Sequence, residues 1–350
     1  MKKSVFALIF AGLLFLLGAL HVILPDKTIS HTERRALARF PAFDSAFTEN
    51  LEKYLPDQFP AREGFRSVKS VFDRLTGRLD TNGIYDVSGW LAPVSFGYDE
   101  SSVIRTAERL TKLRGMFAEC PAAVICVIPP KTVYMHDGVH PVPDFGSLTE
   151  TLMRHTDGYG FCGITGTLSL ESYYKNDSHW RQEMLDETAR MICSSLGVHY
   201  VTEEFTEHRM ADFYGVYAGQ SALPVEPDVL VYRSSPSIDN ADVTAVGSEM
   251  TSVYTPEEIG VDMYDVFLGG AVPVIEIVNE NGSGELVVIR DSFGSSLIPL
   301  LIPSFHRITA VDLRYISTAY LDQYADWDGA DLLILLSADV IANSEMLRIE

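Results

Sequence analysis

LVVIRDSFGSS, at residues 286–296, is the stretch that decides the fold of this chain. An apolar strand ends at Arg290, small polar residues form a turn, and the apolar helical run LIPLL follows at 297–301. In a parallel α/β sheet, ligands bind at the edge formed by the carboxyl ends of the strands. We therefore expect Ser292 at that edge, beside the unpaired N–H groups of a helix amino terminus.

Other apolar runs alternate with helical patterns on both sides of this stretch. Ala122–Ile128 is continuously apolar, which is typical of a strand buried on both faces. The pattern predicts helices at Val103–Phe117 and Trp180–Leu196, and further strands at Val198–Val201, Val229–Tyr232, Ile308–Leu313 and Leu332–Leu336. The runs Val274–Val278 and Leu286–Ile289 flank Asn-Gly-Ser-Gly at 281–284, which predicts a hairpin. This alternation favours an α/β fold with an open, mostly parallel sheet flanked by helices.

The amino-terminal segment predicts the compartment. Lys2 and Lys3 precede an apolar run from Ser4 to Leu24 that is about 31 Å long as a helix, enough to cross a membrane. The run ends without a good cleavage site, so we expect an uncleaved signal anchor at residues 1–25, with secretion after cleavage as the alternative. The two lysines keep the amino terminus in the cytoplasm, which places the rest of the chain outside it.

Three segments are therefore expected: the signal anchor at 1–25, an extension at 26–90 and the main domain at 91–350. The extension contains two helical patterns, one through Phe47–Leu55 and one through Phe65–Leu75 that ends at Gly77. Gly83–Leu91 predicts a short strand and turn.

Composition excludes several classes of protein. Of 350 residues, 47% are hydrophobic and 21% are charged, which excludes wholesale disorder. The formal net charge is -21, from 27 Lys and Arg against 48 Asp and Glu, so a nucleic-acid partner would be repelled. No pattern indicates a cofactor. His136 and His140 have the spacing of a helical metal site, but Gly138 makes that helix doubtful, so no metal is expected.

A second polar motif complements Ser292. A serine hydroxyl is a poor nucleophile until a base removes its proton, and Asp177-Ser178-His179-Trp180 contains a histidine with a carboxylate two residues earlier. His179 is therefore a candidate base and Asp177 a candidate orienting acid. The backbone N–H groups of Ser292 and Phe293 would hold an oxyanion.

Each of these signals has a simpler interpretation. Ser292 or Asp291 fits an N-cap residue, and Asp177 fits one equally well. Lys131, after the buried strand, is either a substrate ligand or a solvated side chain. Trp180 and neighbouring aromatic residues either stack on a sugar or belong to the core. Arg314, close to Asp312, is either a substrate ligand or part of a structural ion pair.

An ordered set of short motifs resembles the DHHW protein family, which is related to the alginate O-acetyltransferase proteins with an SGNH-hydrolase-like domain. Ser178 departs from the family pattern, because it stands where the family name has its first histidine. The matching pieces are Glu33-Arg34-Arg35, Phe40-Pro41, Asp57-Gln58-Phe59-Pro60 with Arg62, Gly89-Trp90-Leu91, Pro130-Lys131, Asp177-Ser178-His179-Trp180, Asp291-Ser292-Phe293 and Asp312-Leu313-Arg314-Tyr315.

The resemblance implies an SGNH-hydrolase-like domain with Ser292 as nucleophile, His179 as base and Asp177 as orienting acid. It also implies O-acetylation of a cell-surface or secreted polysaccharide, with the acyl group delivered by a multispanning membrane O-acyltransferase. Two alternatives stay open at this point. One is a carbohydrate esterase, in which water replaces the sugar hydroxyl. The other is a non-catalytic protein that binds glycan or acts as a scaffold for an acyltransferase complex.

Overall fold

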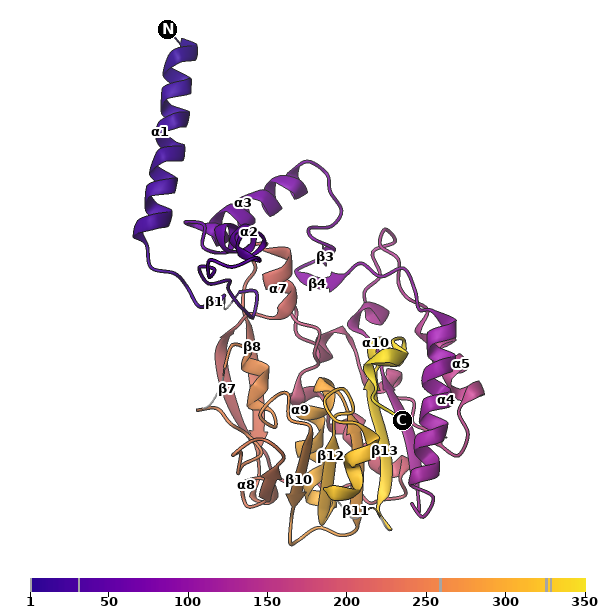
Figure 1. Cartoon of the computed structure of the whole chain (residues 1–350). Helices are drawn as coiled ribbons and strands as arrows, with labels where there is room; N and C mark the ends of the chain where they lie inside the picture. Colours follow the sequence, from indigo (N-terminus) through magenta and orange to yellow (C-terminus); the bar gives the residue numbers. More distant parts are fainter. Residues whose placement is uncertain (1, 31, 258–259, 325–326, 328) are drawn as a thin grey trace.

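The computed structural model describes residues 2–30, 32–257, 260–324, 327 and 329–350. A seven-stranded sheet forms its centre, in the order β6-β5-β13-β11-β12-β10-β9 (Figure 1). The strands of this sheet are β5 (Ala123–Ile128), β6 (Gly160–Phe161), β9 (Asp242–Ala245), β10 (Val274–Val278), β11 (Glu285–Arg290), β12 (Arg307–Val311) and β13 (Asp331–Ser337).

The sheet is mostly parallel, which confirms the predicted fold class. β6, β5, β13, β11 and β12 pair in parallel, whereas β10 is antiparallel to both β12 and β9. β11 and β13 lie inside the sheet and are buried on both faces, as their continuous apolar sequences require.

Helices cover both faces of the sheet, and each face has its own core. Leu110 of α4 (Glu100–Met116) and Leu148 of α5 (Phe145–His155) pack with Ile334 in one core. Ile192 of α6 (Asp186–Ser195) and Leu297 of α9 (Ser292–Leu301) pack with Leu333 in the other. Because Leu333 and Ile334 are consecutive, their opposite directions show the two-residue alternation of a strand. The short helix α10 (Ala338–Ile341) follows β13.

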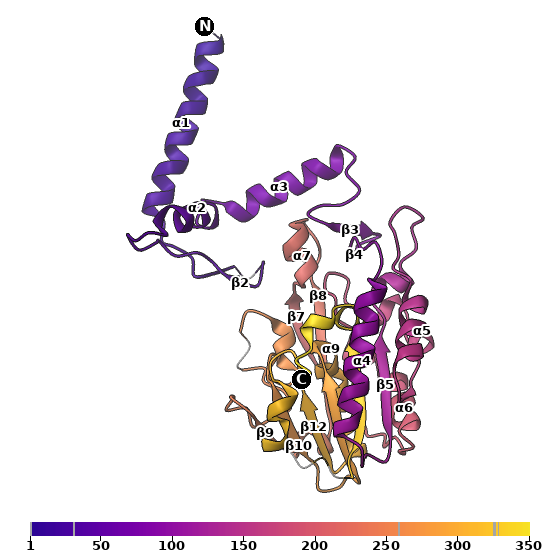
Figure 2. The ribbon, with the colours of Figure 1, turned by 45° about the vertical axis from the view of Figure 1, so that its right-hand side comes forward.

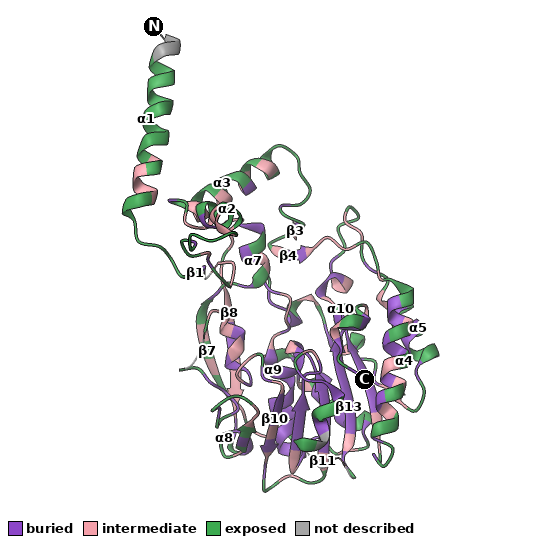
Figure 3. Cartoon of the chain, viewed as in Figure 1, coloured by how far each residue is buried: buried purple, intermediate pink, exposed green. Residues whose placement is uncertain are grey.

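The amino-terminal part lies apart from the sheet, towards one end of the molecule (Figures 1 and 2). The helix α1 (Lys2–Ile23) extends away from the body and is long and apolar enough at Val5–Ile23 to cross a membrane. None of that apolar stretch is buried; Figure 3 shows most of it exposed, with intermediate burial in the turns nearest the body. The rest of this part consists of β1 (Ile29–Ser30), β2 (Arg35–Ala36), α2 (Phe47–Asp57), α3 (Arg62–Leu75), β3 (Ile84–Val87) and β4 (Trp90–Pro93).

A small two-stranded ribbon flanks the main sheet. β7 (Thr206–Phe213) pairs antiparallel with β8 (Asp228–Ser234), and α7 (Val216–Ser221) connects them. The strand predicted at Val229–Tyr232 therefore exists, but it lies outside the main sheet. The short helix α8 (Pro236–Asp239) follows β8.

The predicted hairpin is wrong. β10 and β11 both form, but β12 lies between them and pairs with each. The intervening loop packs on the turn before β12: the Asn279 N–H donates to the His306 carbonyl and the His306 N–H donates to the Gly284 carbonyl. A turn signal specifies where the chain bends, but not which strand becomes the neighbour.

Two further predictions from local pattern fail nearby. The helix expected from Trp180 begins only at Asp186, because Trp180 is held in extended conformation opposite Tyr173. Val198–Val201 forms no strand, and the Val201 N–H donates instead to Ser304 Oγ. In both places tertiary contacts override the apolar pattern.

Candidate active site

Ser292 is the first residue of α9, at the turn after β11. The helix cap is Asp291, whose carboxylate accepts the N–H of Phe293 at 3.0 Å and the N–H of Ser337 at 2.8 Å. Because Asp291 caps the helix, the hydroxyl of Ser292 is left for another partner. That partner is His179, whose Nε2 lies 2.8 Å from Ser292 Oγ.

The His179 ring connects two segments that lie 113 positions apart in the sequence. Its Nδ1 lies 2.6 Å from Oδ1 of Asp177. A histidine protonated on Nδ1 donates to the carboxylate and accepts the serine proton at Nε2, which is the arrangement of an activated hydroxyl. The His179 side chain is 12% exposed and the Asp177 side chain is fully buried. A ligand therefore approaches these hydrogen-bonded side chains from the Ser292 end.

Asp177 is held by several donors. Its Oδ1 also accepts the His179 N–H, and its Oδ2 accepts the Val216 N–H at 2.8 Å. Arg34 places a guanidinium nitrogen 3.2 Å from the same Oδ2. Burial alone would raise the pKa of Asp177, but His179, Arg34 and the hydrogen bonds hold that pKa well below its usual value. The carboxylate therefore stays charged and fixed.

Two residues of this site, Arg34 and Tyr264, were given no role by the sequence analysis. Arg34 also donates to Asp262 at 2.6 Å and to the Tyr214 carbonyl, so the extension contributes directly to the site. The only sequence signal for Arg34 is that Glu33-Arg34-Arg35 resembles a motif of the DHHW family. Tyr264 stacks on the His179 ring with 3.9 Å between centroids and donates its hydroxyl to Ser296 Oγ. Tyr264 belongs to the short 3-10 helix Met263–Val266, and no sequence pattern there indicates a contact with His179.

The structure buries Lys131, so the interpretation of this residue as a solvated side chain is wrong. It was expected to bind substrate or to be solvated, but it is 2% exposed and donates to three backbone carbonyls. Those carbonyls belong to Tyr174, Lys175 and Asp177, at 2.8–3.0 Å. Burial lowers the pKa of Lys131 to about 7. Lys131 thus holds the loop that carries the candidate acid and base, and because it also borders the neighbouring pocket, a contact of Lys131 with substrate stays a prediction.

For Trp180, the structure agrees with the alternative that placed it in the core. It is fully buried, and its Nε1 donates to the Phe293 carbonyl and to Ser296 Oγ, both at 2.9 Å. It therefore joins the histidine loop to α9 and cannot stack on a sugar. Arg314 makes a two-pronged ion pair with Asp312, as the structural interpretation expected. A contact of Arg314 with substrate stays a prediction.

The predicted oxyanion donors are only partly consistent with the structure. The N–H of Phe293 is already bonded to Asp291, so it is not available to an oxyanion in this arrangement. The N–H of Ser292 is the first of α9 and has no acceptor within the helix. Ser292 therefore remains the candidate backbone donor.

A pocket opens beside the site, between the Asp177 loop, α9 and the end of β13. Its lining mixes hydroxyl, aromatic, basic and acidic groups, including Tyr98, Lys131, Ser178, Tyr217, Phe293 and Asp339. Among the residues that the structure describes, no three His, Cys, Asp or Glu side chains gather as metal ligands do. His140 instead pairs with Asp137 and stacks on Tyr85.

Comparison with known proteins shows which solved structures share this fold. No protein-family model and no curated protein matches the sequence. Among solved structures, a DHHW family protein from Eubacterium siraeum matches 76% of this chain and 94% of its own, with 19% identity and a TM-score of 0.64. PatB1 from Bacillus cereus, solved with a sulfonyl adduct, matches 76% of this chain and 98% of its own, with 15% identity and a TM-score of 0.61. The O-acetyltransferase domain of Pseudomonas putida AlgJ matches at 11% identity over 74% of this chain and 92% of its own, with a TM-score of 0.47.

These likenesses confirm at the level of the fold the relationship that the sequence motifs indicated. The chain shares the architecture of the DHHW family protein and of PatB1 over three quarters of its length.

Proposed function

We propose that this protein is a membrane-anchored, extracytoplasmic O-acyltransferase that acetylates hydroxyl groups of a cell-surface or secreted polysaccharide. The observation that carries the proposal is the continuous hydrogen-bonded chain from Ser292 Oγ through the His179 ring to Asp177. In this proposal residues 1–25 anchor the protein, 26–90 form an extension and 91–350 form the catalytic domain.

The first half of the reaction forms an acyl-enzyme. Nε2 of His179 takes the proton of Ser292 as Oγ attacks the carbonyl carbon of the acyl donor. The oxyanion that develops is held by the Ser292 N–H, and one such donor typically stabilises the transition state by about 2.7–4 kcal/mol. When the carbonyl re-forms, the donor group leaves with the proton from His179. Asp177 keeps the ring oriented and stabilises its charged form.

The second half transfers the acetyl group. A sugar hydroxyl gives its proton to His179 Nε2 and attacks the acyl-enzyme carbonyl, and the collapse of the intermediate returns that proton to Ser292 Oγ. Attack by water would release acetate instead, so the two activities differ in the acceptor and share all the residues named. The resemblance to the DHHW and alginate O-acetyltransferase proteins favours the sugar acceptor.

The candidate site is connected to the apolar helix α1, which suits an acyl donor supplied at the membrane. α1 is apolar, exposed and long enough to cross a bilayer, and Arg34 from the extension contacts the buried Asp177. We therefore propose that a multispanning membrane O-acyltransferase supplies the acetyl group.

Stopped-flow kinetics of the full chain in detergent, with p-nitrophenyl acetate, tests the covalent step. We expect a burst of p-nitrophenol equal to the enzyme concentration, absent in Ser292→Ala, with acetyl transfer to added oligosaccharide exceeding hydrolysis. Ser195→Ala is the matched control, because this exposed serine at the end of α6 lies outside the candidate site. A burst that survives Ser292→Ala rejects this nucleophile, and release of acetate alone in the presence of oligosaccharide assigns an esterase.

A further inference from the structure

The helix α3 exposes its apolar side. Phe65, Val68, Phe72 and Leu75 are 52%, 69%, 63% and 81% exposed, and their spacing of three and four residues places them on one face. A helix of a globular domain normally turns such a face towards the core. Four large apolar side chains on one exposed helix face therefore indicate that another surface covers them.

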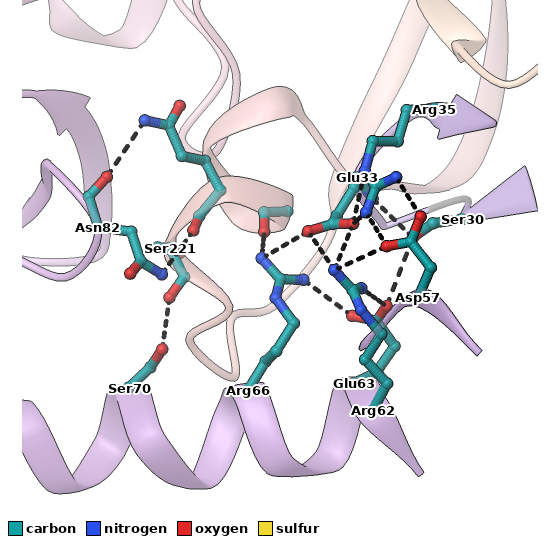
Figure 4. A network of polar contacts seen from close by, with 12 residues as sticks. Ser30, Glu33, Arg35, Asp57, Arg62, Glu63, Arg66, Ser70, Asn82 and Ser221 are labelled. Carbon is teal, nitrogen blue, oxygen red and sulfur yellow. Dashed lines mark hydrogen bonds and ion pairs between the residues drawn. The ribbon is translucent and has the colours of Figure 1, made fainter. Parts of the chain in front are cut away.

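The opposite face of α3 is polar and is the face that contacts the protein. Ser70 lies about half a turn from the centre of the apolar face and donates its hydroxyl to the Ser221 carbonyl at 2.7 Å. Arg66 donates to the Gly219 carbonyl at 2.8 Å and pairs with Glu33 (Figure 4). The usual orientation of an amphipathic helix is thus reversed, and hydrogen bonds to α7 fix it that way.

The position of α3 relative to α1 indicates what covers the apolar face. The last turn of α1 contacts α2, through the ring of His21 against that of Tyr54 at 5.6 Å. α3 follows α2 after four residues and lies at the level of the lower end of α1 in both views (Figures 1 and 2). If α1 crosses the membrane, this is the level of the outer headgroups.

The surroundings of the apolar face fit a lipid surface. Phe59 packs on Phe65 at 5.6 Å and extends the apolar face, being itself 38% exposed. Although the chain as a whole is strongly acidic, residues 62–78 carry five basic and two acidic side chains. Lys69, Arg74 and Arg78 are the most exposed of the basic ones, and they pair with Asp73 or Asp86 at the surface. A helix with an apolar face and flanking basic residues is typical of one that lies in a membrane interface.

We propose that α3 lies in the outer interface of the membrane, with Phe65, Val68, Phe72 and Leu75 inserted at the boundary between headgroups and acyl chains. The inference rests on the proposed anchoring by α1 and adds a second attachment that fixes how the domain is oriented. α7 links this attachment to the candidate active site, since Gly219 and Ser221 hold α3 while the Val216 N–H holds Asp177.

The test uses the full chain reconstituted into vesicles of phosphatidylcholine and phosphatidylglycerol, with no other protein. A single cysteine labelled with an environment-sensitive fluorophore is placed at Phe72→Cys; the native cysteines are buried. Met153→Cys on α5 is the matched control, 50% exposed, and Phe15→Cys, 80% exposed, reports insertion of α1. Each probe is challenged with iodide in the water and with a doxyl-labelled lipid in the bilayer.

We expect the Phe72 probe to be quenched by the doxyl lipid and to resist iodide several-fold better than the Met153 probe. Lipid quenching at Phe15 with iodide quenching at Phe72 overturns the inference while leaving the anchor intact, and it assigns the apolar face to a protein partner. Resistance to both quenchers at Phe72 also overturns it, because a second copy of the chain then covers the face. Lack of lipid quenching at both Phe15 and Phe72 overturns the anchoring together with the inference.

Discussion

Arg34 is the residue that connects the extension to the chemistry of the site. Its guanidinium lies 3.2 Å from Asp177 and 2.6 Å from Asp262, and its side chain is 10% exposed. Its backbone has a φ of 51°, in the left-handed region where a non-glycine residue costs about 1 kcal/mol or more. The contacts of the guanidinium offset that strain and balance the charge of a fully buried carboxylate.

Replacing Arg34 with glutamine should therefore destabilise the fold. We expect the free energy of unfolding to fall by about 3 kcal/mol at neutral pH, since the change leaves Asp177 as a buried charge without its cation. Because Arg34 holds the pKa of Asp177 down, that pKa rises in the variant, and the difference from wild type shrinks as the pH falls through the range where Asp177 takes up its proton. Urea unfolding at several pH values measures both effects.

The exposed Arg39 provides the control, because Arg39→Gln should change stability by less than about 0.5 kcal/mol. Equal effects of the two substitutions would show that the contact of Arg34 with Asp177 contributes nothing.

Lys131 gives a second test at this scale. Lys131→Met removes the donor to three buried carbonyls, and we expect a loss of about 3 kcal/mol in stability and of most catalytic activity, since the Asp177 loop is no longer held. Lys175→Met is the matched control on the exposed side of the same loop. Unchanged stability and activity in Lys131→Met would contradict the role of Lys131 in holding the Asp177 loop.

The three side chains of the candidate site could be singled out from sequence, but their surroundings could not. Ser292 follows a recognisable strand, and Asp177 precedes His179 at a spacing that suits one loop. For Lys131 and Trp180 two roles stayed open, a contact with substrate and a simpler one, because sequence does not reveal burial. The oxyanion role of Phe293 failed for a different reason, because the side chain of its neighbour Asp291 reaches that N–H first.

Among the elements, β11 and α9 form where the local pattern predicts them, whereas the predicted pairing of β11 with β10 is wrong. Apolar runs identify strands because burial on both faces demands them. Strand order depends on contacts between distant segments, such as the loop at 279–284 against residues 305–306. The insertion of β12 between β10 and β11 is therefore invisible to local sequence.

Gly282 is where this packing is tightest. A Cβ added there would lie 2.0 Å from the Phe305 carbonyl oxygen, in the turn that leads into β12. We expect Gly282→Ala to lower stability by about 2 kcal/mol, the usual effect of overpacking, and to reduce the melting temperature. Gly166→Ala, which meets nothing within 4 Å, is the control, and equal melting temperatures for the two variants would contradict the proposed packing.

The helix α2 has a pH-dependent attachment. Arg35 lowers the pKa of Asp57 to about 2, with a further contribution from the Ala38 N–H. A carboxyl whose folded pKa is depressed stabilises the fold above its ordinary value of 3.8 and loses that contribution as the pH falls towards 2. We therefore expect Asp57→Asn to reduce the loss of stability between pH 4 and pH 2.

Urea midpoints across this pH range measure that change. Glu52→Gln, on the exposed side of the same helix, should leave the pH dependence unaltered. If Asp57→Asn still loses stability steeply between pH 4 and pH 2, other carboxyl groups cause that loss.

On the scale of the whole molecule, the candidate site is assembled from three distant parts of the chain. Arg34 comes from the extension, Asp177 and His179 from the loop before α6, and Ser292 from the centre of the sheet. The same extension carries α3 and follows α1, so the proposed membrane attachment and the support of the site belong to one continuous segment (Figure 1). Sequence indicated the anchor and the sheet, but not that the segment between them reaches the buried carboxylate.

The most direct test of this assembly is covalent labelling with a sulfonyl fluoride, followed by mass spectrometry of the intact chain and of its peptides. A sulfonyl fluoride reacts with a serine that has an efficient base, so we expect one adduct per chain, located on Ser292, and a sharp fall in labelling in His179→Ala. An adduct on any other residue, or undiminished labelling of Ser292 without His179, would contradict the account.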